Sequence, residues 1–128
     1  NPDLIIQALD THGPERVVLG IDARDGFVRV AGWEKATRVT PIALAYRFIV
    51  HSLTTIIYTN VRRDGMETGV DVESTTELAS ATGLEVIASG GVGTLADIRK
   101  VKAAGLPGVV VGKALYEENF KLSEAIKC

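Results

Sequence analysis

Two glycine-containing turns in the C-terminal third of the chain have the composition of a phosphate-binding site. They lie in Val86-Ile-Ala-Ser-Gly-Gly-Val-Gly93 and in Val109-Val-Val-Gly-Lys-Ala114. Each apolar run reaches glycine and continues with helical spacing, as a buried parallel strand does before a helix. Backbone N–H groups at Gly90, Gly91 and Gly112 can approach a ligand closely, and helix N-termini favour phosphate. Two such turns on consecutive βα units are typical of the phosphate site after strands 7 and 8 of a (βα)8 barrel, although tight turns alone would also explain the glycines.

A carboxylate stands at the expected end of an earlier strand. Val17-Val-Leu-Gly-Ile21 is a continuous apolar run, typical of a strand buried on both faces, and Asp22 follows it. Catalytic groups of barrel enzymes lie at the C-terminal ends of strands, so Asp22 is a candidate for acid-base chemistry. The alternative is that Asp22 only caps the following turn. Asp25 and Asp64 each precede glycine, so both can simply shape turns.

The remaining sequence predicts alternating strands and helices that would position these residues. The predicted order is a helix over 2–10 ended by His12-Gly13-Pro14; a strand over 17–21; a hairpin containing Phe27 to Val30; a helix capped by Thr40-Pro41; a strand over 55–59; a helix from Asp71 or Ser74 closed by Gly83; a strand from Val86; a helix from Thr94 to Gly105; a strand over 109–111; and a final helical region ending at Cys128. Such alternation predicts a parallel sheet with right-handed crossovers. A full barrel takes about 250 residues, so we expect one α/β domain over residues 1–128, a (βα)4 half of a TIM (βα)8 barrel.

Composition excludes several classes of protein. The 128 residues carry a net charge of -2 and have no block of lysine and arginine, which argues against nucleic-acid binding. The single cysteine, Cys128, provides neither a disulfide framework nor a zinc site, and this fits a reducing compartment. No signal peptide or membrane-length apolar run is present, so we predict a cytoplasmic location. The first residue is Asn1 rather than methionine, and we expect the chain to be a piece of a longer protein.

Taken together, the motifs closely resemble one enzyme family over nearly the whole chain. They are Val18-Leu-Gly-Ile-Asp-Ala-Arg-Asp-Gly26, Gly32-Trp33, Ile56-Ile-Tyr-Thr59, Arg63-Asp-Gly65, Val86-Ile-Ala-Ser-Gly-Gly-Val92 and Val110-Val-Gly-Lys-Ala-Leu-Tyr116. The chain resembles the C-terminal half, strands 5 to 8, of the phosphoribosylformimino-5-aminoimidazole carboxamide ribotide isomerases of histidine biosynthesis. The sister family, the cyclase subunit of imidazole glycerol phosphate synthase, shares the strand-5 aspartate but fits less well around Gly32-Trp33 and Gly112-Lys113-Ala114.

The resemblance implies an Amadori rearrangement, in which a bis-phosphorylated aminoaldose opens and becomes an aminoketose. By that resemblance Asp22 is the general acid, Thr59 assists by hydrogen bonding and Asp64 orients the substrate. Trp33 matches a residue that stacks on a substrate ring, although it could instead cover the core under the hairpin. The residues implied to hold one phosphate are Ser89, Gly90, Gly91, Gly112 and Lys113, with the backbone N–H of Lys113 a better candidate than its side chain. We predict no cofactor and no metal ion.

Three features depart from the family pattern. The N-terminal half is missing, and with it the strand-1 aspartate that serves as general base and the turns that bind the second phosphate, so we expect the isolated half to be inactive or weak. Asn60 stands where the family usually has an acidic residue, and this alters the charge beside Thr59. The segment from Tyr46 to Leu53 is apolar where the family has a charged helix end and a glycine turn, and an apolar patch there would favour association with another chain.

Three functions therefore remain open. In the first, the chain is the catalytic C-terminal half of the isomerase. It would act on a phosphorylated small-molecule substrate when it is paired with a first half. Alternatively it is a self-associating structural or engineered half-barrel, a homodimer that binds phosphate without catalysis. The third alternative is half of the cyclase subunit. No nucleic acid or membrane partner is expected.

Overall fold

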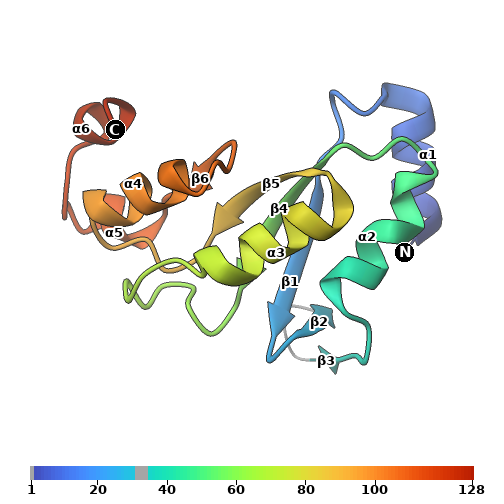
Figure 1. Ribbon diagram of the computed structural model, residues 1–128, viewed down its shortest axis with the longest axis horizontal. Helices are drawn as coiled ribbons and strands as arrows, with labels where there is room; N and C mark the ends of the chain where they lie inside the picture. Colours follow the sequence, from blue (N-terminus) through green and yellow to red (C-terminus); the bar gives the residue numbers. More distant parts are fainter. Residues whose placement is uncertain (1, 31–34) are drawn as a thin grey trace.

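The computed structural model describes residues 2–30 and 35–128, and the predicted βα alternation is confirmed within them (Figure 1). In chain order the elements are α1 (Pro2–His12), β1 (Leu19–Arg24), β2 (Phe27–Val30), β3 (Lys35–Ala36), α2 (Pro41–Ile49), β4 (Thr55–Asn60), α3 (Val72–Thr82), β5 (Glu85–Ser89), α4 (Leu95–Ala103), β6 (Val109–Val110), α5 (Lys113–Tyr116) and α6 (Leu122–Ile126). The last helical region is two short helices rather than one, and β6 is shorter than expected.

The strands form one open sheet in the order β3-β2-β1-β4-β5-β6. β1, β4, β5 and β6 are parallel, and each lies beside the next parallel strand along the chain. The β2–β3 hairpin adds antiparallel pairing at the C-terminal end of β1, where Ala23 lies opposite Val28. Sequential parallel strands with helical crossovers are the arrangement of a (βα)8 barrel, so the sheet is a partial TIM barrel that is not closed.

Side-chain caps fix where the helices begin. Thr40 accepts a hydrogen bond from the Ala43 amide and precedes the proline at the first position of α2, as expected. The sequence left the start of α3 open between Asp71 and Ser74. The helix is capped by Asp71, whose carboxylate accepts a hydrogen bond from the Ser74 amide at 3.1 Å. A capping box between Thr94 and Asp97 starts α4.

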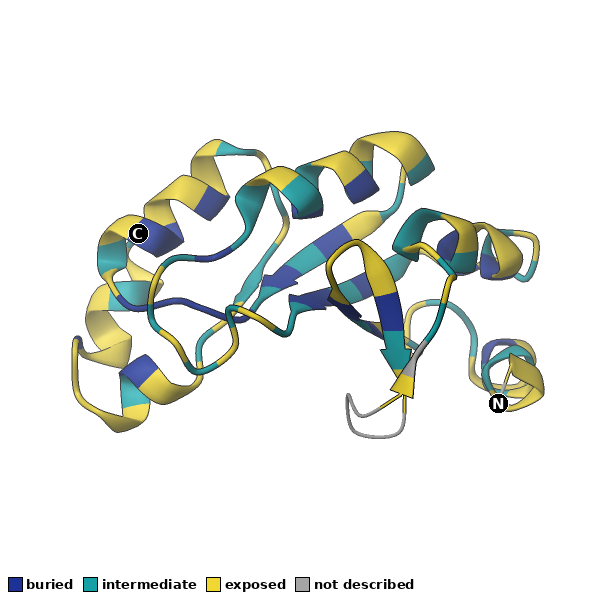
Figure 2. Cartoon of the chain, turned by 90° about the horizontal axis from the view of Figure 1, so that it is seen from below, coloured by how far each residue is buried: buried dark blue, intermediate teal, exposed yellow. Residues whose placement is uncertain are grey.

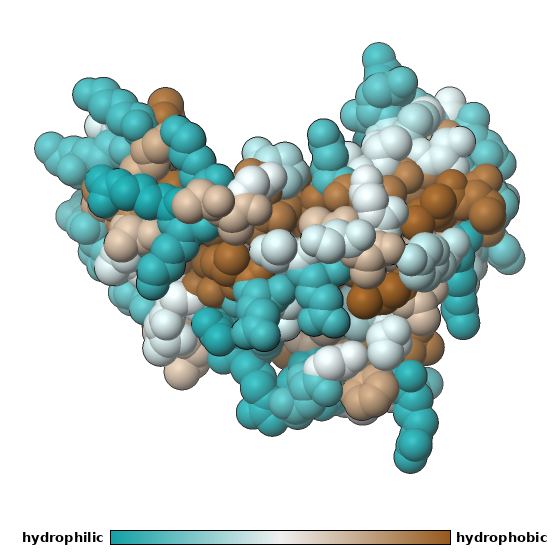
Figure 3. Space-filling model, in the orientation of Figure 1, coloured by the Kyte–Doolittle hydropathy of each residue, from teal (hydrophilic) through white to brown (hydrophobic). Residues whose placement is uncertain are grey.

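The junction between α2 and β4 lacks glycine and proline, yet the helix ends cleanly. Ser52 takes the left-handed backbone conformation, with φ of 72°, that glycine usually supplies. The apolar segment expected here as a patch is divided by this turn. Leu53 is 2% exposed in the core, whereas Val50 is 81% exposed. Hydrophobic surface is visible at the end of the molecule that carries α1 and α2 (Figure 3).

Only one face of the parallel sheet is covered by helices. In Figure 2 the helices α2, α3 and α4 follow one side of the sheet, and the other side carries the strands without a helix across them. Burial alternates accordingly: Ile21, Ile56 and Val86 are at most 1% exposed on the helix side. On the opposite side, Ile57 and Ile87 are half-buried and Val110 is 42% exposed. Because the inner face of a barrel is normally filled by side chains, this is the face that a closed barrel would bury.

Candidate functional site

Three predicted site residues lie in one row across the sheet. Asp22 pairs in register with Thr59, and Thr59 pairs in register with Ser89. Parallel partners in register point to the same face, so all three belong to the face without helices, at the C-terminal ends of their strands. Neighbouring strands are about 4.8 Å apart, which places Asp22 and Ser89 about 10 Å from each other. The row is therefore long enough to contact both ends of a small substrate, and not only the bond that reacts.

The loop between β4 and α3 is folded by a set of internal hydrogen bonds. The Asn60 side chain donates to the Asp71 carboxylate at 2.8 Å and accepts from the Arg62 amide at 3.1 Å. The Arg63 guanidinium donates to the carbonyl of Gly69 at 3.1 Å. Burial raises the pKa of Asp71, but the hydrogen bonds from Asn60 and Ser74 and the charge of Arg63 outweigh it and leave that pKa below its usual value. These bonds hold Asp64 at the edge of the glycine turn.

The glycines of the first turn are required by this loop. The Gly69 amide donates to the Gly91 carbonyl at 2.9 Å, and a Cβ on Gly91 would lie 2.3 Å from the Gly69 carbonyl oxygen. Gly90 and Gly91 also have φ values of 90° and 94°, which side-chain-bearing residues rarely adopt. Gly112 is different: its φ is -112°, and a Cβ there would meet nothing within 4 Å. Chain packing therefore accounts for Gly91 but not for Gly112.

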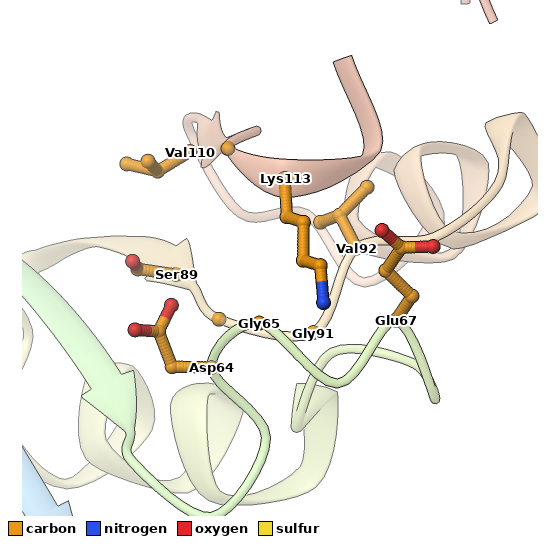
Figure 4. Close-up of a pocket in the computed structure, with 10 residues that line it drawn as sticks. Asp64, Gly65, Glu67, Ser89, Gly91, Val92, Val110 and Lys113 are labelled. Carbon is orange, nitrogen blue, oxygen red and sulfur yellow. The ribbon is translucent and has the colours of Figure 1, made fainter. Parts of the chain in front are cut away.

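One pocket gathers all five residues implied to hold phosphate. It has a volume of about 50 Å³, and its lining residues are Asp64, Gly65, Glu67, Ser89, Gly90, Gly91, Val92, Val110, Gly112 and Lys113. In Figure 4 the Asp64 carboxylate lies beside the Ser89 side chain, and the Lys113 side chain extends toward Gly91 from the other side. The Lys113 ammonium is 3.7 Å from the Glu117 carboxylate. The pocket thus combines backbone turns, a hydroxyl and one cation, which suit a small anion, with the carboxylates of Asp64 and Glu67, which oppose one.

Asp22 lies at a second, larger hollow. This hollow has a volume of about 340 Å³ and lies between α1, β1, β2 and α2, with Asp22 and Gly20 contributed by β1. Thr59 is 8% exposed and is among the lining residues of neither hollow. The structure therefore brings Asp64, Ser89, Gly90, Gly91, Gly112 and Lys113 together and leaves Asp22 at the other end of the row. Trp33 lies outside the described residues.

The hairpin is tied to the β4–α3 loop by an ion pair that the sequence did not indicate. The Arg62 guanidinium donates to both carboxylate oxygens of Asp25, at 2.6 and 2.8 Å. The hydrogen bond from Arg62, aided by its charge, lowers the pKa of Asp25 below its ordinary value. Asp25 has a φ of 55° before Gly26, so its turn-forming role is also present. Arg62 and Arg63 are adjacent and chemically alike, so the sequence does not indicate which of them pairs with Asp25. The loop conformation directs Arg62 to Asp25 and Arg63 to the Gly69 carbonyl.

Sequence reasoning missed Glu67, which lines the pocket, and Asn119, which is hydrogen-bonded to it. The Asn119 side chain donates to the Glu67 carboxylate at 2.8 Å across 52 positions of the chain. No local motif marks such a contact.

Among residues 2–30 and 35–128, no group of three His, Cys, Asp or Glu residues is arranged to hold a metal ion. No helix in the same part of the chain is long and apolar enough to cross a membrane.

Replacing Asn60 with aspartate is expected to destabilise the loop at neutral pH. The change removes the donor to Asp71 and places a second carboxylate against the first, with an expected loss of about 1.5–3 kcal/mol of unfolding free energy. Repulsion raises the pKa of the pair above the unfolded value, so the penalty should shrink as pH falls. Urea denaturation of both chains at neutral and acidic pH measures this difference, and equal midpoints at neutral pH would contradict it.

Comparison with known proteins gives a consistent set of relatives. A family described as histidine biosynthesis protein matches residues 1–121. The chain is 46% identical over 127 residues to a 1-(5-phosphoribosyl)-5-((5-phosphoribosylamino)methylideneamino)imidazole-4-carboxamide isomerase from Acetivibrio thermocellus, covering 99% of this chain and 53% of the relative. It is 46% identical to the isomerase of the same name from Thermoanaerobacter pseudethanolicus, again over 99% of the chain and 53% of the relative. The chain thus spans about half the length of these relatives.

Proposed function

The chain belongs to the histidine biosynthesis protein family, and from this premise we propose that it is the C-terminal half, strands 5 to 8, of an isomerase barrel. The proposed reaction is the Amadori rearrangement of a bis-phosphorylated aminoaldose to an aminoketose. The observation that carries the proposal is the register of Asp22, Thr59 and Ser89 on the open face of the sheet. The isomerase name of the two relatives above supports this reaction over that of the sister cyclase.

In the proposed mechanism Asp22 is the general acid. Its carboxyl group gives a proton to the ring oxygen of the aminoaldose as the bond between that oxygen and the first ring carbon breaks. A base then removes the proton from the neighbouring carbon, which yields the aminoketose after tautomerisation. Thr59 assists by hydrogen bonding, and Asp64 orients the substrate. The base belongs to the half of the barrel that this chain does not include, so the isolated chain should be inactive or weak.

One phosphate of the substrate is proposed to bind at the pocket between β5 and β6. Ser89 and the backbone at Gly90, Gly91 and Gly112 would surround the anion, with Lys113 supplying positive charge. The open position at Gly112, where a Cβ would meet no atom within 4 Å, supports close approach of a ligand there. A role for Trp33 in stacking and a cytoplasmic location stay predictions from the sequence.

A second candidate function is favoured by the uncovered face of the sheet. Ile57, Ile87 and Val110 leave apolar surface on that face, and a two-fold homodimer would cover it in both copies. Such a half-barrel would bind phosphate without catalysis. Light scattering coupled to size exclusion separates these cases: a stable dimer that binds phosphate and never converts substrate supports the structural alternative, whereas a monomer contradicts it.

The experiment that tests the isomerase proposal is complementation. The chain is mixed in turn with the N-terminal and the C-terminal half of the Acetivibrio thermocellus relative, and conversion of aminoaldose to aminoketose is measured. Conversion should appear with the N-terminal half and stay at the level of the chain alone with the C-terminal half. Conversion with neither half, under conditions in which a mixed complex forms, would contradict the proposal.

A further inference from the structure

One side-chain amide joins the three segments that surround the anion pocket. The side-chain nitrogen of Asn119 donates to Oε2 of Glu67 at 2.8 Å and to the carbonyl oxygen of Gly93 at 3.1 Å. Glu67 is in the β4–α3 loop and Gly93 is in the β5–α4 turn, and both segments supply residues that line the pocket. Asn119 itself follows α5, whose first residue is the pocket residue Lys113. The three segments are therefore held together by a residue that lies outside the pocket lining.

The backbone at the end of α5 fixes the place of Asn119. Its N–H donates to the Ala114 carbonyl at 3.0 Å. The preceding N–H, of Glu118, donates to the Leu115 carbonyl at 3.2 Å, and Glu118 has a left-handed φ of 58°. These are the two hydrogen bonds of a Schellman motif, in which Asn119 is the last residue. Because Ala114 is buried in the core, Asn119 is anchored to a packed part of the chain.

The two partners of Asn119 determine how its amide is oriented. A primary amide carries both of its donor hydrogens on nitrogen, and both partners here are acceptors, a carboxylate and a backbone carbonyl. The reversed amide would place its oxygen against two other oxygens, so one orientation alone satisfies the contacts. A hydrogen bond to a charged acceptor is stronger than one between neutral groups, and Glu67 is the charged partner. Asn119 therefore acts mainly on the position of the Glu67 carboxylate.

The backbone of Glu67 is fixed independently of its side chain. Its φ is 56°, and its carbonyl oxygen packs so closely on Gly93 that a Cβ there would lie 2.5 Å away. The carboxylate, in contrast, is held through Oε2 by Asn119. Its other oxygen, Oε1, is buried and accepts no hydrogen bond within the described residues. A buried oxygen without a donor is costly, so a carboxylate released by Asn119 would turn toward a cation.

Lys113 is the cation that a released Glu67 carboxylate would meet. Both residues line the pocket, and Figure 4 shows them on the same side of it. Within the described residues the Lys113 ammonium pairs with Glu117, at 3.7 Å, and not with Glu67. Because the side chains of that pair are about half exposed, it restrains Lys113 only weakly. An ion pair between Glu67 and Lys113 would remove the positive charge that is proposed to hold the anion.

We propose that Asn119 is a positioning residue of the anion pocket, which holds the Glu67 carboxylate at the rim and so leaves the Lys113 ammonium for the anion. The inference rests on the proposed phosphate site and adds to it a residue that does not line the pocket. Asn119 acts through Glu67 and does not touch the anion. In the proposed reaction it serves the binding of a substrate phosphate and not the proton transfer at Asp22.

Sulfate is a suitable probe because it is a divalent anion of the size of phosphate, and isothermal titration calorimetry at neutral pH measures its affinity. Asn119→Leu removes both hydrogen bonds while roughly keeping the size of the side chain. Its dissociation constant for sulfate should rise by about 3- to 10-fold, the range expected for loss of a hydrogen-bonded contact. The matched control is Gln7→Leu, the same loss of an amide at an exposed position of α1, at the opposite end of the molecule (Figure 1). Its affinity for sulfate should not change.

A double-mutant cycle tests whether Asn119 acts through the charge of Glu67. Glu67→Gln keeps an oxygen that can accept from Asn119 and removes the charge that opposes the anion, so sulfate should bind more tightly than to the unmodified chain. Without that charge no ion pair with Lys113 can form. Glu67→Gln with and without Asn119→Leu should therefore bind sulfate equally.

The urea midpoint of each variant separates positioning from stability. If Asn119→Leu lowered the midpoint while the folded chain bound sulfate as before, the role of Asn119 would be structural and the proposal would be wrong. An equal loss of affinity in the presence and absence of the Glu67 carboxylate would also overturn it. In both cases sulfate still binds the unmodified chain, so the phosphate site stands. Absence of sulfate binding by the unmodified chain would overturn the phosphate site and this inference together.

Discussion

Replacing Gly91 with alanine should lower the free energy of unfolding by about 2–6 kcal/mol, the sum of a strained backbone and an overpacked contact. The backbone contribution arises because Gly91 has a φ of 94°. The packing contribution arises because the new Cβ would lie 2.3 Å from the Gly69 carbonyl oxygen. That oxygen is part of the loop that carries Asp64 and Glu67, so the loop must move away from the turn. The midpoint of urea denaturation measures the loss.

Gly112→Ala is the matched control for this prediction. A Cβ at Gly112 would meet nothing within 4 Å, in contrast to the close contact at Gly91. Its stability should fall by less than that of Gly91→Ala, because no packed atom has to move to admit the methyl group. Sulfate binding should nevertheless weaken, since the methyl group would occupy space proposed for the anion. Equal destabilisation by the two substitutions would contradict the distinction between a packing glycine and a ligand glycine.

The difference between these glycines shows where sequence reasoning ends. The run from Val86 to Gly93 indicated a strand, a turn and a helix, and all three are present. The turn's glycines suggested phosphate, with a tight turn as the alternative. Neither reading included the loop that packs on Gly91, because that contact joins residues far apart in the sequence. The local part of the pattern was therefore predictable, and the tertiary reason for the glycine was not.

The helix and strand boundaries were predictable to different degrees for a similar reason. Thr40 and Thr94 cap their helices through bonds to residues three positions away, which the sequence displays directly. The end of α2 depends on Ser52 in a left-handed conformation, which no residue type there announces. Glu67 and Asn119 are brought together across 52 positions by the fold. Candidate residues at strand ends could be named in advance, but the groups that surround them could not.

The second large effect is expected for Asp22→Asn in the completed barrel. With the chain joined to the N-terminal half of a relative, kcat/KM for the rearrangement should fall by about 10²–10⁴-fold, the usual contribution of a general acid. Asparagine keeps the shape of the side chain and cannot deliver a proton to the ring oxygen. The unfolding midpoint should be measured in parallel, because a change confined to activity separates a chemical role from the capping role that the sequence left open.

Asp25→Asn is the control for Asp22. It removes the same charge from the same end of β1, at a carboxylate that is paired with Arg62 and is 58% exposed. Exposed ion pairs contribute about 0–1 kcal/mol, so its effect on stability and activity should be small.

If the two variants lost activity equally, the negative potential at this end of the sheet would matter rather than an acid at Asp22. If only Asp22→Asn lost activity, the row from Asp22 to Ser89 would join an acid to an anion site about 10 Å away. That separation lets the phosphate hold the substrate while its ring oxygen reaches the acid.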